Sequence, residues 1–414
     1  MTSAGTSGNG RFTLSGAFRA LGNRNFRLFW SGQVVSLTGT WMQMVAQSWL
    51  VYRLTDSALL LGLTSFLQRA PMFFLSIPAG VVADRLPKRS LVIGTQLLAM
   101  LQAGVMAWLT LSGRITITEV LVLSTLLGLI YSLDMPSRQA FIGEMVGPSD
   151  LGSAIALNST AVNAARIVGP ALAGVLVAAI GEGLCFLVNC LSYLAVLAGL
   201  LMMRVPRAAP GPWSGFRREM FAGLRYVRDT KCVLYPLLAV AAVSFFGMPY
   251  VVLMPIMAQD VLMRGSQGLG LLMAAAGVGA LIGAFVLAGQ PDARRLPRMI
   301  ALAALLMGFG LTGFGLSRSF ALSMAMMLGV GMCLMMVTAS TNTYLQSVVP
   351  DKLRGRLMSA YAMVFLGVVP FGGLAAGTSA HLIGAPLTIA ICGGLTMLLS
   401  LPLGRAIQRH CRLA

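Results

Sequence analysis

Charged side chains inside long apolar stretches are the residues of this sequence best placed to do chemistry. Arg69, Asp134, Arg138 and Arg166 each fall within or at the end of such a stretch. A charge in hydrocarbon is costly, and where one persists it usually marks a substrate or ion pathway. We therefore take these side chains as candidates for substrate binding or proton coupling.

Asp134 and Arg138 lie four residues apart, a spacing that places both side chains on one face of a helix, where they can pair. Asp134 is the acidic residue that falls deepest inside an apolar stretch. Two interpretations stay open. The pair is structural and stabilises a helix end, or Asp134 exchanges a proton during transport.

Arg69 and Arg166 have no obvious acidic partner at their depth. They can bind a substrate or act in gating, or they can bind backbone carbonyls, amide side chains or water. Neutral polar side chains that could hydrogen-bond into a cavity, or else join one helix to another, are Gln43, Gln47, Asn158 and Asn163.

The sequence contains no arrangement that indicates catalysis or a cofactor. It has no G-x-x-x-x-G-K-[S/T] loop for ATP hydrolysis. It also has no nucleophile–base constellation, and its 6 cysteines show no metal-ligand spacing. We predict that the protein is not an enzyme and binds neither a metal nor a cofactor.

The elements that must position these residues are stretches long enough to cross a membrane, which takes about 20 apolar residues per helix. The chain is 57% hydrophobic and only 10% charged, whereas soluble proteins average about 25% charged residues. The sequence therefore predicts an all-α membrane protein. Its twelve predicted spans are 29–52, 57–80, 90–111, 118–142, 152–180, 182–203, 233–259, 266–289, 298–317, 320–347, 357–382 and 385–404.

The net charge of +18 is spread unevenly over the linkers. Most of the 30 lysines and arginines fall before the first span, after the last one, or in the even-numbered linkers, while the other linkers carry Arg53, Arg114, Arg264 and Arg318. Basic residues accumulate on the cytosolic side of membrane proteins. This asymmetry predicts that both termini are cytosolic, and it argues against nucleic-acid binding. No cleavable signal peptide is evident.

A long basic linker divides the chain into two sets of six spans. The tetrapeptide Arg85–Lys88 after the second span resembles Arg295–Arg298 after the eighth, as expected if the halves arose by duplication. Within the linker, apolar residues recur at helical spacing among arginines, which indicates an amphipathic helix on the membrane surface or else a solvated connector. The predicted divisions are 1–28 (cytosolic segment), 29–203 (first bundle), 204–232 (linker), 233–404 (second bundle) and 405–414 (cytosolic tail).

The loop between the second and third spans contains a spaced set of small and charged residues: Gly80, Asp84, Arg85, Lys88 and Arg89. A carboxylate at a helix end can meet a neighbouring helix N-terminus or an arginine, and such a contact can hold two halves together until they rock apart. The loop resembles the G-x-x-x-D-R-x-x-K/R-R signature of the major facilitator superfamily, although a proline precedes Lys88 where the family usually has glycine. The resemblance implies two pseudo-symmetric six-helix bundles around a central cavity.

The fifth predicted span carries Gly169, Pro170 and Gly174. Proline removes a backbone hydrogen bond and small residues permit close helix packing. The segment resembles the exporter-associated motif of the same superfamily, with alanines at two of its glycine positions. Generic small-residue packing is the alternative.

Segments around Phe26–Tyr52 and Asp134–Phe141 resemble a bacterial exporter branch that includes enterobactin exporters, macrolide exporters and lysophospholipid transporters. The resemblance implies a monomer in the bacterial cytoplasmic membrane, surrounded by lipid, that exports an amphiphilic small molecule by proton antiport. The excess of arginine over acid within the spans favours an acidic substrate, such as a siderophore, rather than a cationic drug. A nutrient importer, a lysophospholipid flippase and a non-transporting scaffold are the alternatives.

Overall fold

The computed structural model describes residues 18–203, 227–290 and 292–411, and this part of the chain is almost entirely helical, with no strand. The predicted all-α fold is therefore confirmed. The N-terminal residues 1–17 and most of the predicted linker helix, residues 204–226, lie outside the described residues.

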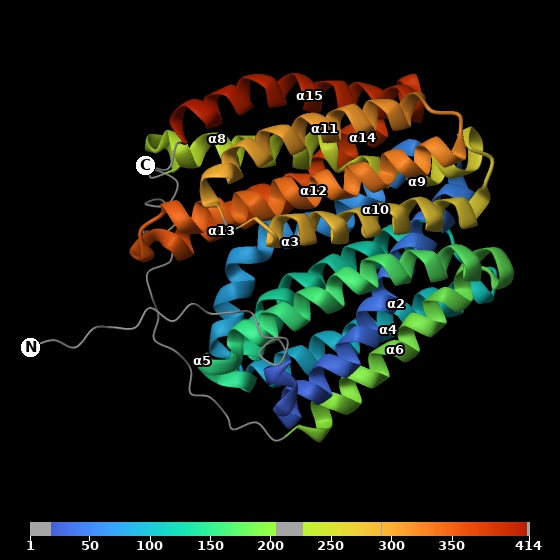
Figure 1. Cartoon of the computed structure of the whole chain (residues 1–414). Coiled ribbons are helices and arrows are strands. Elements are labelled where there is room, and N and C mark those ends of the chain that lie inside the picture. The colour runs from blue at the N-terminus through green and yellow to red at the C-terminus, as the bar shows by residue number, and fades with distance from the viewer. Residues whose placement is uncertain (1–17, 204–226, 291, 412–414) are drawn as a thin grey trace, which may run out of the picture.

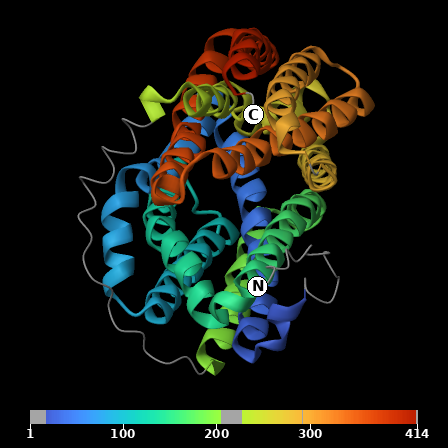
Figure 2. The same cartoon turned by 60° about the vertical axis from the view of Figure 1, so that its left-hand side comes forward.

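The helices form two groups that lie one above the other in Figure 1 and remain separate in the rotated view of Figure 2. The first group comprises η1 (Arg19–Gly22), α2 (Arg24–Thr55), α3 (Ala58–Arg85), α4 (Lys88–Leu111), α5 (Ile117–Ile180) and α6 (Glu182–Met202). The second comprises α8 (Lys231–Ala242), η2 (Val243–Gly247), α9 (Tyr250–Ile256), η3 (Met257–Val261), α10 (Gly265–Ala288), η4 (Ala293–Arg295), α11 (Leu296–Leu316), α12 (Phe320–Val348), α13 (Asp351–Gly367), α14 (Val369–Ile383) and α15 (Ala385–His410).

Element α5 consists of two helices that meet at a kink, and these correspond to the fourth and fifth predicted spans. It runs for 64 residues and leaves helical geometry only at Gly147, whose φ of 71° favours glycine. Acidic residues on both sides of this kink pair with basic residues of other elements. Glu144 pairs with Lys88 at 3.5 Å, and Asp150 pairs with Arg19 at 3.0 Å.

Two helical regions of the second group are interrupted near prolines. Between Lys231 and Val261 the chain contains two π-helical turns, η2 and η3, with Pro249 and Pro255 between them. Helices α13 and α14 meet at Val368, two residues before Pro370. A proline removes one hydrogen bond from a helix and so favours a kink or a π-bulge.

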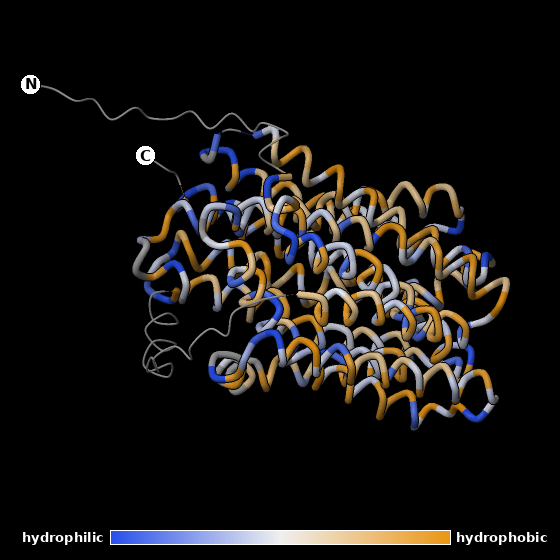
Figure 3. The backbone as a smooth tube through the Cα atoms, turned by 90° about the horizontal axis from the view of Figure 1, so that it is seen from below, coloured by the Kyte–Doolittle hydropathy of each residue, from blue (hydrophilic) through white to orange (hydrophobic). Residues whose placement is uncertain are grey.

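Eleven helical segments of the described chain are long and apolar enough to cross a membrane. Helix α2 has 32 residues but is not among them, because polar side chains interrupt its apolar sequence. The predicted total of twelve spans therefore stays a prediction. In Figure 3 hydrophilic positions gather toward the two ends of the helices and hydrophobic positions along their length, as expected of membrane spans.

Candidate functional site

The second part of α5 packs directly against α10 of the other group, through glycines. A Cβ added to Gly174 would lie 2.9 Å from the Cα of Gly270, and one added to Gly270 would lie 2.6 Å from the carbonyl oxygen of Pro170. On the other side of α5, a Cβ on Gly169 would lie 2.5 Å from the Cβ of Trp41 on α2. The residues of the predicted exporter motif thus bring α5 into backbone contact with both groups of helices.

Helices α3 and α14 form a second close contact between the groups. A Cβ on Gly62 would lie 3.0 Å from the Cα of Gly377, and one on Gly377 would lie 2.7 Å from the carbonyl oxygen of Ala58. Gly62 is near the start of α3 and Gly377 near the end of α14. This contact and the Gly174–Gly270 contact therefore lie toward the same end of the molecule, which the charge asymmetry predicts to be the outer end.

A polar contact joins the groups at this same end. The hydroxyl of Tyr52, near the end of α2, donates a hydrogen bond to Asp260 Oδ2 in η3. Nearby within the first group, Arg53 Nε lies 2.7 Å from Glu182 Oε1. The hydrogen bond between Tyr52 and Asp260 therefore ties the two groups together beside the glycine contacts.

A pocket lies between the two groups and contains Arg69. Its lining residues come from α2, α3, α9 and α10: Met44, Gln47, Ser48, Val51, Leu61, Thr64, Ser65, Gln68, Arg69, Val251, Val252 and Met273. Water could occupy about 50 Å³ of the space among them. None of these described lining residues is acidic, so the guanidinium of Arg69 gives the pocket a positive charge.

Arg69 has a weak partner in the pocket, because its Nη2 atom lies 3.9 Å from the sulfur of Met44. Gln47, which also lines the pocket, donates to Ser124 Oγ at 2.8 Å. Arginine, amide and hydroxyl groups on one side of the pocket face Val251 and Val252 on the other. This arrangement suits a ligand that has both an anionic and an apolar part.

Arg166 is not among the residues that line this pocket. Its guanidinium carbon lies 5.3 Å from the centre of the Trp41 ring, a cation–π distance. Among the described residues, its buried Nε atom has no hydrogen-bond partner. Arg166 thus keeps an unused donor close to the contact between the groups.

Asp134 lies inside the first group of helices rather than in the pocket. Its side chain is 2% exposed. Thr95 Oγ1 and Gln96 Nε2 each donate to its Oδ1 atom at 2.8 Å, and Arg138 Nη2 lies 3.4 Å from its Oδ2 atom. The predicted pair with Arg138 is therefore present, and α4 supplies two further donors.

The other predicted amides do not lie in the pocket. Gln43 Nε2 donates to Gln102 Oε1 at 3.1 Å, and Asn189 Nδ2 donates to Gln43 Oε1 at 2.5 Å, so Gln43 joins α2 to α4 and α6. Asn163 donates to the carbonyl oxygen of Ser159 on its own helix, and Asn158 is half-buried on the same helix.

The signature loop between α3 and α4 is described in part. The Asp84 side chain lies outside the described residues. Arg89 donates from Nη2 and Nε to the carbonyl oxygen of Leu200 at 2.8 and 3.0 Å, and so satisfies the C-terminal end of α6. Lys88 contacts Glu144, Arg85 is exposed, and a Cβ on Gly80 would meet no atom within 4 Å. The gating role of this loop stays a prediction.

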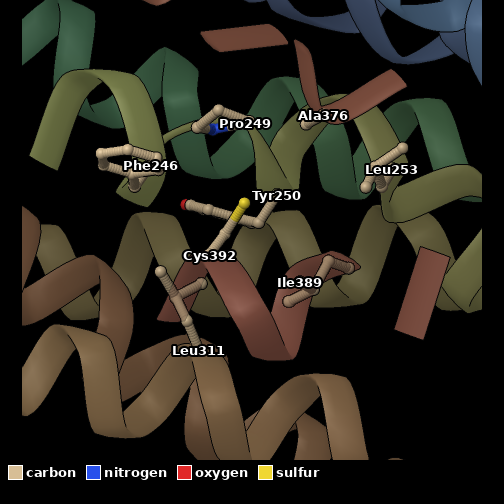
Figure 4. A pocket seen from close by; sticks show the side chains of 8 residues that line it. All are labelled: Phe246, Pro249, Tyr250, Leu253, Leu311, Ala376, Ile389 and Cys392. Carbon is tan, nitrogen blue, oxygen red and sulfur yellow. The ribbon is translucent and has the colours of Figure 1, made fainter. Parts of the chain in front are cut away.

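A second, apolar pocket, too small to admit a water molecule, lies within the second group of helices (Figure 4). It is lined by Phe246, Pro249, Tyr250, Leu253, Leu311, Ala376, Ile389 and Cys392. Helix α9 separates the two pockets, since Val251 and Val252 line one while Tyr250 and Leu253 line the other. No cluster of side chains in the described part of the chain could hold a metal ion.

Residues 15–412 match the family model of the transmembrane secretion effectors, a branch of the major facilitator superfamily. The chain belongs to this family of transporters. The transporter is 24% identical to the staphyloferrin A transporter of Staphylococcus aureus, over 91% of this chain and 94% of that protein. It is 21% identical to macrolide efflux protein A of Streptococcus pyogenes, over 91% and 94% of the two chains.

Another relative is the multidrug efflux pump Tap of Mycolicibacterium fortuitum, 24% identical over 83% of this chain and 87% of the pump. Solved structures agree on the fold. A POT peptide transporter superposes with a TM-score of 0.75 at 14% identity, covering 94% of this chain and 95% of its own. A bacterial homologue of the lysosomal transporter Spinster does so with a TM-score of 0.73 at 14% identity, covering 96% and 99%.

The structure of the transporter also adds polar residues that sequence reasoning missed. The partners in these contacts lie far apart in the chain. Thr95 and Gln96 donate to Asp134, Gln102 and Asn189 bond to Gln43, and Tyr52 bonds to Asp260. One signal was available in the sequence. Residues 33, 36, 40, 43 and 47 are polar at alternating spacings of three and four, the pattern of a polar stripe along one face of α2.

Proposed function

We propose that the protein exports an amphiphilic, acidic small molecule across the bacterial cytoplasmic membrane in exchange for protons. The observation that carries the proposal is Arg69 in a pocket between the two groups of helices, among polar and apolar lining residues with no acid beside it. In a low-dielectric pocket an uncompensated guanidinium favours a carboxylate or a similar anion over a cation.

Alternating access would expose this pocket first to one side of the membrane and then to the other. In the proposed cycle the substrate binds at Arg69 from the cytosolic side, and Asp134 takes up a proton from outside on the return step. The proposal places both termini in the cytosol, treats residues 29–203 and 233–404 as the two moving bundles, and takes the monomer as the working unit.

Export, rather than import, is supported by the efflux functions named for the macrolide and multidrug relatives and by the glycine contacts of α5. A siderophore, a drug and a specialised metabolite are all compatible with an acidic amphiphile. Deletion of the gene should raise the intracellular level of the substrate. A failure of nutrient uptake in the deletion strain would indicate an importer, and movement of labelled lysophospholipid in proteoliposomes would indicate a flippase.

The charge preference is tested with purified protein in proteoliposomes, using pairs of dyes matched in size and hydrophobicity but opposite in charge. We expect faster transport of the anionic dyes, and we expect Arg69→Gln together with Arg166→Gln to reduce that preference about tenfold, equivalent to about 1.4 kcal/mol of lost charge interaction. Arg114→Gln, at an exposed position outside the pocket, is the matched control. Faster transport of cations by the wild-type protein would contradict the proposal.

A further inference from the structure

Gln47 has an unused hydrogen-bond acceptor in the pocket that contains Arg69. The residue lines the pocket and is 3% exposed. Its Nε2 atom donates to Ser124 Oγ at 2.8 Å, whereas its Oε1 atom is buried and has no hydrogen-bond partner among the described residues. Leaving a buried polar atom unpaired is destabilising, so such an atom in the wall of a pocket points to a ligand that pairs with it.

Ser124 fixes which end of the Gln47 amide is free. The Ser124 hydroxyl donates to the carbonyl oxygen of Val120 at 2.6 Å, so its proton is not available to Gln47. Ser124 Oγ can therefore only accept from the amide, and the amide can donate only through its nitrogen. The free atom is the amide oxygen, and it needs a donor from a ligand.

Two hydroxyl groups of the pocket are also acceptors. Ser48 donates to the carbonyl oxygen of Val45 at 2.9 Å, and Thr64 donates to that of Leu60 at 2.7 Å. Each proton is thus committed to the residue's own helix, while each oxygen keeps a lone pair for another donor. Together with Gln47, these hydroxyls offer a ligand acceptors rather than donors.

Arg69 reaches α2 one helical turn away from Gln47. Its Nη2 atom lies 3.9 Å from the sulfur of Met44. Met44 precedes Gln47 by three residues, which corresponds to about 4.5 Å along a helix, and residues at this spacing lie on the same side of it. The guanidinium of Arg69 and the free oxygen of Gln47 are therefore both within reach of one small polar head group.

We propose that Gln47 recognises a neutral hydrogen-bond donor close to the carboxylate of the substrate, so that the preferred head group is a 2-hydroxy acid. The inference rests on the proposed function, because it takes Arg69 as the site of the anion. The carboxylate pairs with Arg69, and the hydroxyl on the adjacent carbon donates to Gln47 Oε1. Val251 and Val252, which also line the pocket, contact the apolar part of the substrate.

Binding of the carboxylate replaces a weak contact of Arg69. A thioether sulfur is a weak acceptor, whereas a carboxylate forms charge-assisted hydrogen bonds with a guanidinium. The carboxylate therefore displaces the sulfur of Met44, whose flexible side chain can move aside. This movement opens space beside Gln47, whose oxygen is closed to water in this structure.

A neutral donor suits this pocket better than a charged one. An ammonium group on the same carbon would also donate to Gln47, but it would place a second positive charge near Arg69. None of the described lining residues is acidic, so nothing among them would balance that charge. Because like charges repel strongly at low dielectric, the pocket favours a 2-hydroxy acid over the corresponding 2-amino acid.

The inference is tested by calorimetric titration of the purified protein in lipid nanodiscs. The probes are three acids of one chain length: 2-hydroxyoctanoate, 2-methoxyoctanoate and 2-aminooctanoate. The methoxy acid keeps the carboxylate and the oxygen but lacks the donor. We expect the hydroxy acid to bind about tenfold more tightly than either of the other two, as one hydrogen bond to a buried acceptor allows.

Three variants show whether this preference depends on Gln47. Gln47→Met should abolish the preference for the hydroxy over the methoxy acid, because methionine has a similar length but no amide oxygen. Ser124→Ala should lower it, because the amide is then free to turn its nitrogen toward the pocket. Gln408→Met makes the same exchange at an exposed position of α15, and it should keep the wild-type preference.

Equal binding of the hydroxy and methoxy acids by the wild-type protein would overturn the role of Gln47 and leave the exporter proposal intact. So would a wild-type preference in Gln47→Met, or in Ser124→Ala should the first variant fail to fold. Tighter binding of the amino acid than of the hydroxy acid would overturn the neutral donor. Binding of none of the acids, or undiminished binding of the hydroxy acid by Arg69→Gln, would overturn the anion site of the proposed function as well.

Discussion

Asp134 has the most complete set of partners of the charged residues that the sequence singled out. Its Oδ1 atom accepts two hydrogen bonds at 2.8 Å, and Arg138 balances its charge. A buried carboxylate needs such donors, because an unpaired one is strongly destabilising. These partners satisfy the Asp134 carboxylate inside the first group of helices.

Asp134→Asn should abolish concentrative efflux while downhill exchange of substrate continues. An amide keeps the shape and the acceptor for Thr95 but can neither take up nor release a proton at this site. Uphill and downhill transport in proteoliposomes, with and without a pH gradient, measure the two activities. Asp292→Asn, at an exposed turn, is the control, and an unchanged pH dependence of transport in Asp134→Asn would assign Asp134 a structural role.

At the scale of elements, the contacts between the two groups depend on glycines rather than on large side chains. Gly174 and Gly270 bring α5 and α10 together, and Gly62 and Gly377 do the same for α3 and α14. Close contact without interlocking side chains gives dispersion attraction at short range, and it leaves two helices free to separate as units. Both properties suit elements that move during transport.

Gly174→Ala should therefore lower both the stability and the transport rate, although it adds only one methyl group. The added methyl group would lie 2.9 Å from Gly270 Cα, so one backbone must shift, and overpacking of this kind costs about 1–3 kcal/mol. Thermal unfolding in detergent and the transport rate should both fall. Gly152→Ala on the same helix meets no atom within 4 Å, and it should leave both values unchanged or raise the stability slightly.

For the whole molecule, three contacts between the groups lie toward one end. The two glycine contacts are joined there by the hydrogen bond from Tyr52 to Asp260. A hydrogen bond to a charged group contributes about 1.5–3 kcal/mol. The bond is therefore strong enough to shift an equilibrium between a state closed at this end and a state open there by more than about tenfold.

Tyr52→Phe should move that equilibrium toward the open state. Spin labels at the exposed Leu59, near the start of α3, and Leu382, near the end of α14, report the separation of the two groups at this end. We expect a larger fraction of long distances in Tyr52→Phe. Tyr235→Phe, whose ring packs against His410 elsewhere, should match the wild type. An identical distance distribution in Tyr52→Phe would show that the bond does not hold the end closed.

The sequence by itself determined the class of molecule. Membrane-spanning helices follow from local hydropathy, since each must satisfy its backbone hydrogen bonds internally and present apolar side chains to lipid. The same local rule identified Arg69 and Asp134 as costly charges. The helices predicted over 118–142 and 152–180 both extend further than predicted, and they meet at the kink at Gly147.

Only the tertiary structure decided which of these residues share a site. It placed Arg69 in a pocket between the groups and Asp134 inside one of them, and it joined Tyr52 to Asp260 across 208 residues of sequence. Hydropathy and spacing describe one helix at a time, because they depend on neighbours three or four residues apart. Partners from different helices are chosen by packing, and packing depends on how glycines and large side chains of distant segments fit together.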